Sequence, residues 1–263
     1  MTDFIDISLI HLVFAYAFIL LVVLLAKWRG ISMGGDIVYS SLRMTLQLIL
    51  AGYLLGYIMG TSNPFAVLAV LLAMQGFAVF NIIKRLKRRI SRRFTIAIAI
   101  AVSGGSISCL LFFVYAVIGI SPWYDPRYFI PIAGMITGNS MTGVAIAAQR
   151  LLDGMAQNAA VVENALMLGA EPKVAARDII GSAFSAAVLP TINNMVGMGI
   201  VSLPGMMTGQ ILAGSSPIVA SKYQIAIILG IAASVAISAV LFTELGYRLF
   251  FTKDKQLIKG STL

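Results

Sequence analysis

The sequence has very few charged residues and only one cysteine, and both shortages exclude large classes of protein. Only 11% of the 263 residues are charged, whereas soluble domains carry roughly 25%. With 59% hydrophobic residues and a mean hydropathy of +0.95, the chain has too little polar surface to cover a water-soluble globule. The single cysteine, Cys109, excludes a disulfide or a thiolate cluster within one chain. The composition therefore predicts an integral membrane protein.

The motifs of several enzyme classes are also missing from the sequence. It has no G-x-x-x-x-G-K-[ST] phosphate loop, no H-E-x-x-H and no G-x-S-x-G. We therefore expect that the chain does not hydrolyse ATP itself and binds no cofactor. The only histidine, His11, lies in an apolar run, where a lone histidine is more typical of packing or the membrane interface than of a ligand. Glu244 precedes Arg248 by four residues, so we expect an ion pair within one helix.

Seven apolar runs of about 20 residues, the length of a spanning helix, follow one another along the chain. They indicate an all-α, polytopic membrane protein with one permease domain over residues 1–263. The expected spans are about 7–26, 38–60, 64–83, 94–118, 128–149, 190–213 and 224–249.

The loop charges predict the orientation of these spans. The side rich in lysine and arginine carries Lys27, Arg29, the run Lys84 to Arg93, Arg150, Lys173, Arg177 and the tail from Arg248. The other side carries Arg127 and Lys222, with Asp3, Asp6 and Asp125. By the positive-inside rule the N-terminus lies outside and the C-terminus in the cytoplasm.

The formal charge of +9 thus follows membrane topology, and we expect no nucleic-acid partner. The run Lys84 to Arg93 either anchors the topology or contacts anionic lipid or a partner. The first residues are acidic and do not form a signal-peptide pattern, so we expect the first run to remain a membrane helix. The expected location is the plasma membrane, which in bacteria is the inner membrane.

The longest polar segment, about 150–189, is expected on the cytoplasmic side. Its pattern predicts a helix from Asn158 to Leu168 that Gly169 ends, and a second helix from Lys173 to Ile180 with Pro172 near its start. The apolar side chains that fit a groove on a partner are Leu166, Leu168 and Ala170. The alternative is a plain connecting loop.

The fifth apolar run places Met135, Asn139 and Thr142 on one helical face, at positions i, i+4 and i+7. Glycines nearby allow helices to approach closely. Asn139 and the methionines either line a translocation path, or Asn139 forms a hydrogen bond between helices.

The sixth run contains Thr191, Asn194 or Met195, and Met198 on one face. The thioether and oxygen groups there either form a ladder for a metal ion or simply pack. The same run is broken at Pro204-Gly205, because proline removes a backbone donor and glycine adds freedom. We expect the segment Ser202 to Met207, including Met206, to act as a hinge or gate near the path.

A short motif in the polar segment resembles a known family. Glu163-x-Ala165-x-x-x-Gly169 is similar to the E-A-A-x-x-x-G loop of ABC transporter permeases, in which this loop is the coupling helix docked on the ATPase subunit. The match is partial, because Leu189-Pro190 lies further beyond the glycine than in the usual motif.

A closer resemblance covers nearly the whole chain. The residues that carry it are Asp36-Ile-x-x-Ser40-x-x-Arg43-x-x-x-Gln47-Leu48, Ile130-Pro-Ile-Ala-Gly134-Met135-Ile-x-Gly138-Asn139-x-Met141, Leu168-Gly-Ala-x-Pro172-Lys, Val201-Ser-Leu-Pro-Gly-Met-Met207-x-Gly209 and Lys222-Tyr-Gln224. On these motifs the chain is identified as a member of the FetB-type (YbbM-like) ABC permeases, whose bacterial members are regarded as iron exporters and whose plant relatives are tied to aluminium tolerance.

The resemblance implies a permease that forms a homodimer and pairs with two copies of a separate ATPase, which binds ATP and Mg²⁺. It implies export of iron or another metal ion. The residues that it places at the ATPase contact are Glu163, Ala165, Leu168, Gly169, Ala170, Pro172 and Lys173. Arg43, with Gln47 one turn on, either snorkels, pairs with Asp36 or contacts the ATPase.

Other functions stay open at this point. The chain has few acidic residues inside its apolar runs, so a free divalent cation finds a poor site there, and a complexed metal or a different small solute is an alternative cargo. An ATPase-independent secondary transporter or channel, and a membrane scaffold or chaperone that transports nothing, are the alternatives to an ABC permease.

Overall fold

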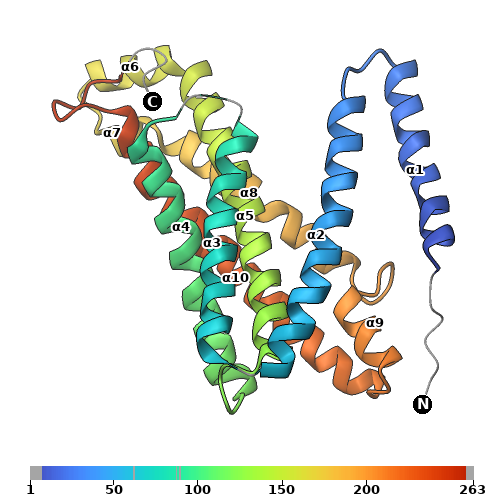
Figure 1. Ribbon diagram of the computed structural model, residues 1–263. Helices are drawn as coiled ribbons and strands as arrows, with labels where there is room; N and C mark the ends of the chain where they lie inside the picture. Colours follow the sequence, from blue (N-terminus) through green and yellow to red (C-terminus); the bar gives the residue numbers. More distant parts are fainter. Residues whose placement is uncertain (1–7, 62, 87, 89, 259–263) are drawn as a thin grey trace. The chain divides into compact units, whose positions relative to one another are not determined.

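The structure is a computed structural model that describes residues 8–61, 63–86, 88 and 90–258. Asp3, Asp6, Lys87 and Arg89, which enter the charge argument above, lie outside the described residues. The chain divides into two compact units, Met1–Ser62 and Asn63–Leu263, called unit 1 and unit 2 below. Each unit is an assembly of helices (Figure 1).

Unit 1 is a hairpin of two long helices, α1 (Leu9–Trp28) and α2 (Gly34–Thr61). Ser8 caps the start of α1, and its hydroxyl also contacts the ring of His11 at 2.7 Å. At the other end Gly30 adopts a left-handed φ of 69°, which lets the chain leave α1 and turn into α2. Tyr16 and Thr45 form a hydrogen bond between the two helices. The lone histidine therefore has a structural contact at a helix start.

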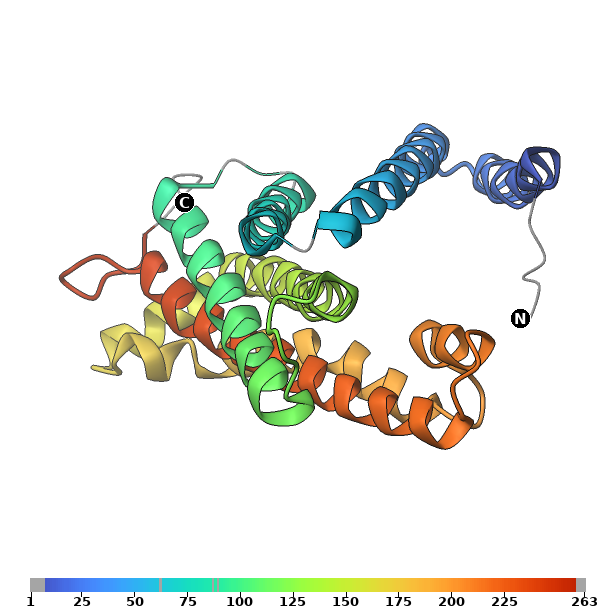
Figure 2. The ribbon, with the colours of Figure 1, turned by 60° about the horizontal axis from the view of Figure 1, so that its bottom comes forward.

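Unit 2 contains the remaining helices. They are α3 (Pro64–Leu86), α4 (Arg92–Phe112) with the π-helical extension η1 (Phe113–Ile118), α5 (Pro126–Gln157), α6 (Ala159–Met167), α7 (Pro172–Ala175), α8 (Arg177–Gly197), α9 (Gly205–Leu212), α10 (Pro217–Gly246) and the 3-10 turn η2 (Tyr247–Phe250). The long helix α10 packs against α4, α5 and α8, and α5 also packs against α3 and α8 (Figures 1 and 2). The core of unit 2 thus lies around α5 and α10.

Small residues bring these helices close together. A Cβ atom added to Gly105 on α4 would lie 2.7 Å from the backbone nitrogen of Ser238 on α10, so no larger residue fits there. Toward the end where α5 meets α6, larger side chains fill the core, and Phe94 meets Phe242 edge to face with ring centroids 5.5 Å apart. The bundle therefore combines close backbone contact along α4 and α10 with an aromatic core at one end.

The predicted number of spans is confirmed, because the described residues contain seven helices that are long and apolar enough to cross a membrane. The predicted bounds of the sixth span, 190–213, are wrong. The helix of that length is α8, which begins at Arg177 and ends at Gly197. Pro190 lies inside α8 instead of starting it, an arrangement that packed membrane helices tolerate. The polar segment between α5 and α8 accordingly shrinks from about 150–189 to residues 158–176.

The predicted break near Pro204 is present in a different form. Residues 198–204 are not helical, and Pro204 precedes the short helix α9. Gly199 has a left-handed φ of 82°, and its N–H donates to the carbonyl of Ser202 at 2.9 Å, which closes a tight loop. The chain thus leaves α8, turns, and reaches α10 through a separate short helix (Figure 1).

Candidate functional site

The first predicted helix of the segment between α5 and α8 is present as α6. The predicted bounds of the second, Lys173 to Ile180, are wrong, because α7 is a single turn, Pro172–Ala175, and residues 177–180 already belong to the spanning helix α8. Asn158 stands at the N-cap position of α6, and Gly169, two residues beyond the last helical residue Met167, has a left-handed φ of 86°. The N–H of Ala170 donates to the carbonyl of Ala165 and that of Gly169 to Leu166, both at 3.0 Å. These two bonds make a Schellman motif, the standard helix stop at glycine. Glycine is required here because the left-handed backbone strains other residues.

Four large apolar side chains project from this pair of helices into the surroundings. Their exposed fractions are 65% for Val161, 82% for Met167, 89% for Leu168 and 62% for Val174. We call these four residues the apolar tip. The sequence pattern identified Leu168 and overlooked the other three. It also assigned Leu166 to the partner-facing side, which is wrong, because Leu166 packs against the core.

The inner face of the same segment is fixed to the bundle. Val162 on α6 and Ala176 after α7 are buried within the core cluster. Gly154 near the end of α5 lies so close to Ile179 of α8 that an added Cβ would meet the isoleucine side chain at 2.6 Å. The apolar tip is therefore the outer surface of a packed element, and Glu163, Ala165 and Pro172 belong to that element.

An ion pair connects this segment to the end of α10. Lys173 Nζ lies 2.7 Å from a carboxylate oxygen of Glu244. The hydrogen bond and negative charge of Glu244 raise the pKa of Lys173 above its ordinary value of 10.5. The expected partner of Glu244 was Arg248, and that expectation is wrong: Arg248 lies over the ring of Tyr247 instead. Because α7 folds against η2, Lys173 is the nearer partner.

The end of the chain adds a second link. The backbone folds back on itself after η2, with a β-bridge between Phe251 and Leu257. This turn brings Lys255 Nζ to 3.7 Å from a carboxylate oxygen of Glu171, the residue before α7. Both side chains are largely exposed, so this pair is a weak contact.

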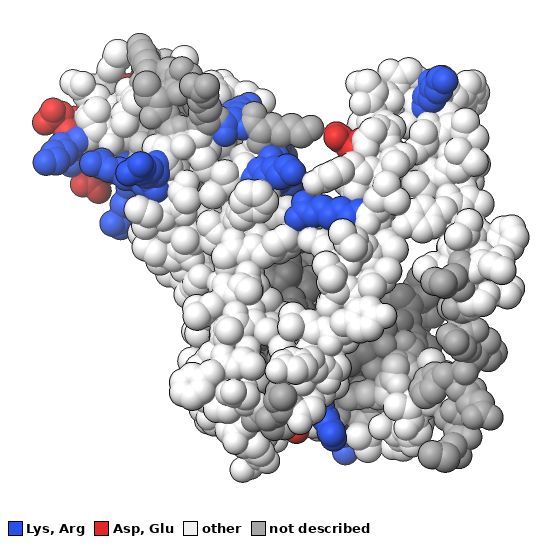
Figure 3. All heavy atoms as spheres, in the orientation of Figure 1, with Lys and Arg blue, Asp and Glu red and all other residues white. Residues whose placement is uncertain are grey.

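The basic side chains of unit 2 gather near the apolar tip. In the part of Figure 3 that shows unit 2, most blue atoms lie toward the end that carries α6 and α7. Arg88 lies there, paired with Asp153 near the end of α5 at 2.9 Å. The charge asymmetry used above for the topology is therefore present in the folded bundle.

The residues assigned to a path on α5 lie on its less packed side. Met135, Asn139 and Thr142 are half-buried, whereas Ile136 and Ser140 on the other side are fully packed. The Asn139 amide donates to the carbonyl of Met135 at 2.8 Å, and the Thr142 hydroxyl donates to that of Gly138 at 3.1 Å. Both bonds stay within α5. They leave the amide oxygen and the thioether of this face as available ligand atoms.

The other path candidates lie on and after α8. Asn194 is exposed, and Met195 and Met198 are half-buried near the end of this helix. Pro204, Met206 and Met207 are half-buried around the start of α9, and Gly205 there is exposed. Met207 contacts the Ser221 hydroxyl of α10 at 4.0 Å. The helix α8 packs against α5, with the backbone of Ala187 close to Gly143.

Three further candidates belong to unit 1. Asp36 stands in the first turn of α2, where a negative charge interacts favourably with the helix dipole. Arg43 and Gln47 follow on the same helix, one turn apart.

A buried polar network in unit 2 was not predicted from the sequence. The Gln75 amide on α3 donates to Ser106 on α4 at 3.1 Å and to Thr137 on α5 at 3.0 Å. Ser140 of α5 and Ser234 of α10 form another buried hydrogen bond at 2.6 Å. Such bonds hold membrane helices in register. A glutamine inside an apolar run was the available sequence signal. Over the described residues, no group of three or more His, Cys, Asp and Glu side chains is placed to hold a metal ion.

Comparison with known proteins assigns the family. The model of an uncharacterised protein family, UPF0014, matches residues 9–251. A UPF0014 membrane protein of Synechocystis is 36% identical over 89% of this chain and 90% of its own length. The probable iron export permease protein FetB of Escherichia coli is 32% identical over 94% and 93%. The protein ALUMINUM SENSITIVE 3 of Arabidopsis thaliana is 32% identical over 92% and 87%. No solved structure matches the chain significantly. The chain therefore belongs to the UPF0014 family of integral membrane proteins.

Proposed function

We propose that the chain is the membrane-spanning subunit of an ABC transporter, driven by ATP that a separate ATPase subunit hydrolyses. The observation that carries the proposal is the apolar tip. Four large apolar side chains on a capped, packed helix pair form a surface suited to enter a groove of a partner protein. Their neighbours include the Glu163-x-Ala165-x-x-x-Gly169 pattern of ABC permease coupling loops.

In the proposed mechanism, the contacts of this segment transmit movement of the ATPase to the membrane helices. ATP binding brings two ATPase subunits together, and each carries the apolar tip of one permease copy with it. The ion pair between Lys173 and Glu244 transmits that displacement to α10. Because α10 packs along α4 and α5, its movement shifts the bundle between two arrangements. The basic end of unit 2, which carries the tip, lies in the cytoplasm in this mechanism.

The proposed cargo is a metal ion, free or complexed, moved out of the cytoplasm. Support comes from the Escherichia coli relative, whose name describes a probable iron export permease. The half-buried face of α5 with Met135 and Asn139 provides thioether and amide groups, and Asn194 in α8 and Met198 just after it provide further groups of the same kinds. In a homodimer the same face of a second copy doubles that set of ligands. Such ligands suit borderline metal ions better than Mg²⁺ or Ca²⁺.

Co-purification tests the proposal. The tagged chain is extracted from its native membrane in a gentle detergent, and the proteins bound to it are identified by mass spectrometry. We expect an ABC ATPase to co-purify with the unmodified chain. We expect the double variant Met167→Gln/Leu168→Gln to lose it, since polar side chains remove the apolar anchor while leaving the inward-facing Val162 in place.

The matched control is Ile200→Gln/Val201→Gln. These residues are similarly exposed, at 91% and 86%, but lie in the loop after α8. We expect this variant to retain the ATPase. Recovery of the unmodified chain without any ATPase would favour an ATPase-independent transporter or channel. Equal loss of the ATPase in both variants would show that exposed apolar residues act non-specifically.

A further inference from the structure

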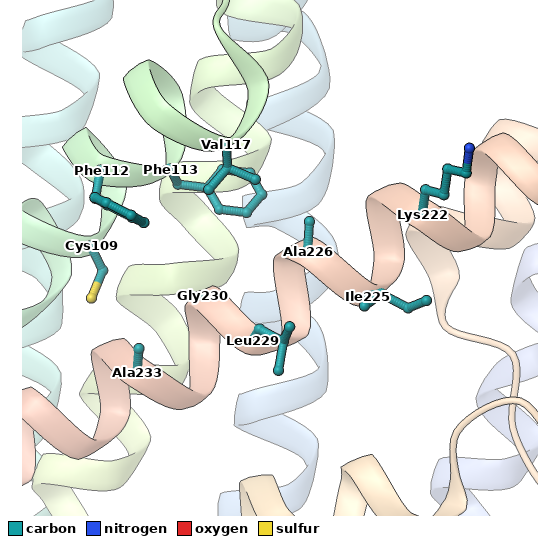
Figure 4. A pocket seen from close by; sticks show the side chains of 10 residues that line it. All are labelled: Cys109, Phe112, Phe113, Val117, Lys222, Ile225, Ala226, Leu229, Gly230 and Ala233. Carbon is teal, nitrogen blue, oxygen red and sulfur yellow. The ribbon is translucent and has the colours of Figure 1, made fainter.

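An apolar groove lies between α10 and the end of α4 with its extension η1, at the end of unit 2 opposite the apolar tip. Its volume is about 520 Å³, within the range of about 300–1,000 Å³ that small-molecule sites occupy. Phe112 and Val117 form one wall, and Leu229 and Ala233 line the other (Figure 4). Cys109 lies at the inner end.

Glycine and the π-helical turn shape this groove. A Cβ atom on Gly230 would lie 3.2 Å from the ring of Phe113. The glycine therefore lets α10 approach η1 closely and places no side chain in the groove. The π-helix η1 widens the turn that carries Phe113 and Val117. The groove is therefore built by a specific backbone irregularity on one side and a missing side chain on the other.

One cation stands at the outer end of the groove. Lys222 lines it and, among the described residues, is the only charged one that does so. In the part of the chain that the structure describes, no carboxylate lies within ion-pair distance of Lys222. Asp125 at the same end accepts the N–H of Arg127 at 3.0 Å, where it caps α5. Lys222 thus gives the mouth of the groove a positive charge that no carboxylate of the described residues compensates.

The length of the groove matches one leaflet of a membrane. Ala233 follows Lys222 by eleven residues on a continuous helix, which is about 16 Å at about 1.5 Å per residue. Half of a hydrocarbon core of about 30 Å is nearly the same. Lys222 lies in the first two turns of α10, a depth at which lysine reaches the head groups.

We propose that this groove holds one acyl chain of an anionic phospholipid, with the lipid phosphate on the ammonium group of Lys222. The apolar walls exclude a hydrated ion, and the single cation at the outer end selects a negatively charged head group. The proposal does not depend on the transport function proposed above.

Native mass spectrometry of the full-length chain, titrated with phosphatidylglycerol or with phosphatidylcholine of identical acyl chains, tests the proposal. We expect about fivefold stronger retention of phosphatidylglycerol, the effect of one basic residue near an anionic surface. Lys222→Gln should bring the two lipids to equal retention. Arg127→Gln, which changes the other cation at this end, should leave the preference intact. Equal behaviour of the two variants would refute the role of Lys222.

A second pair of variants tests the apolar walls. Ala226→Leu/Ala233→Leu fills the groove with helix-favouring side chains and should reduce retention of both lipids. The control Ala69→Leu/Ala73→Leu makes the same change on an exposed face of α3 and should have no effect. Unchanged retention when the groove is filled would contradict the proposal.

Cross-linking of the unmodified chain needs no variant. Phosphatidylglycerol with a photoactivatable group at the acyl terminus should label peptides around Cys109 and Leu229. Labelling spread evenly over all spans would indicate bulk lipid only and overturn the proposal. Efficient Cys109 to Cys109 cross-linking between copies would overturn it in favour of a protein partner.

Discussion

Two connecting segments of unit 2 have the same length but are held very differently. Residues 158–176 join α5 to α8, and residues 198–216 join α8 to α10, with 19 residues in each. The first has Val162 and Ala176 in the core, one ion pair to Glu244 of α10 and one to Lys255. The second contains no charged residue and no buried one. Both contain a short helix that stops at a left-handed glycine.

The difference separates two mechanical roles. A segment tied to the core at several points moves the bundle when a partner moves it. A segment with few fixed contacts can change conformation at low cost while the bundle stays intact. The first therefore suits force transmission, and the second suits a gate or hinge, which is the role predicted for Ser202 to Met207.

The largest expected effect comes from breaking the link between the first segment and α10. Lys173→Glu or Glu244→Lys should reduce ATP-dependent transport about tenfold, within the usual range of coupling energies. The double reversal should restore most of the activity, because the opposite charges meet again. The stability of the protein should change little, since the pair is partly exposed. Transport assays in vesicles and thermal unfolding measure the two quantities. Failure of the double variant to recover would remove the ion pair from the mechanism.

A smaller effect is expected at the glycine that ends α6. Gly169→Ala strains a left-handed backbone at a cost of about 1–2 kcal/mol, and the strain falls directly beside the apolar tip. We expect weaker binding of the ATPase, measured by co-purification. Gly214→Ala imposes the same strain at φ 96° in the second segment and should leave ATPase binding unchanged. Similar losses in both variants would show that the two segments do not differ in role.

The second segment is tested by Pro204→Ala/Gly205→Ala. Alanine restores a backbone donor and favours helix, so the loop should extend α9 and lose freedom. We expect impaired transport with intact ATPase binding, whereas the tip variants lose ATPase binding. Transport equal to that of the unmodified chain would contradict a gate at Ser202 to Met207.

The smallest expected effect is that of pH on the ion pair between Lys173 and Glu244. A lysine with a raised pKa contributes its stability below its unfolded value of 10.5 and loses it only as the pH rises through the raised value. Lys173 is therefore charged throughout an assay range of about pH 6 to 9. Transport by the unmodified chain and by Lys173→Arg should follow the same pH profile over that range. Divergent profiles would mean that Lys173 changes its protonation state.

The sequence predicted the class of fold and the local helix signals well. Long apolar runs are unambiguous, and Gly169 and Pro172 fix the ends of short helices through backbone geometry alone. The start of the sixth span was mistaken because Pro190 was taken as a helix start, whereas packing against α5 and α10 lets α8 continue through it. Local chemistry does not contain that tertiary information.

The candidate site was predicted in outline. Leu168 and Gly169 followed from motif and turn chemistry. The pairing of Lys173 with Glu244, residues far apart in the sequence, depends on how the end of the chain returns to α7, which no local pattern encodes. The inward position of Leu166 likewise depends on how α6 lies on the core.

The measurement that tests the central claim most directly is a site-specific cross-link to the ATPase. The chain has one cysteine, so Cys109→Ala gives a background in which Leu168→Cys or Ile200→Cys is the only thiol. A short bifunctional maleimide is added to membranes that contain the chain and its partner. The account predicts an adduct with an ABC ATPase from Leu168→Cys and none from Ile200→Cys. An ATPase adduct from Ile200→Cys alone, or none from either position while the complex is intact, would contradict docking at the apolar tip.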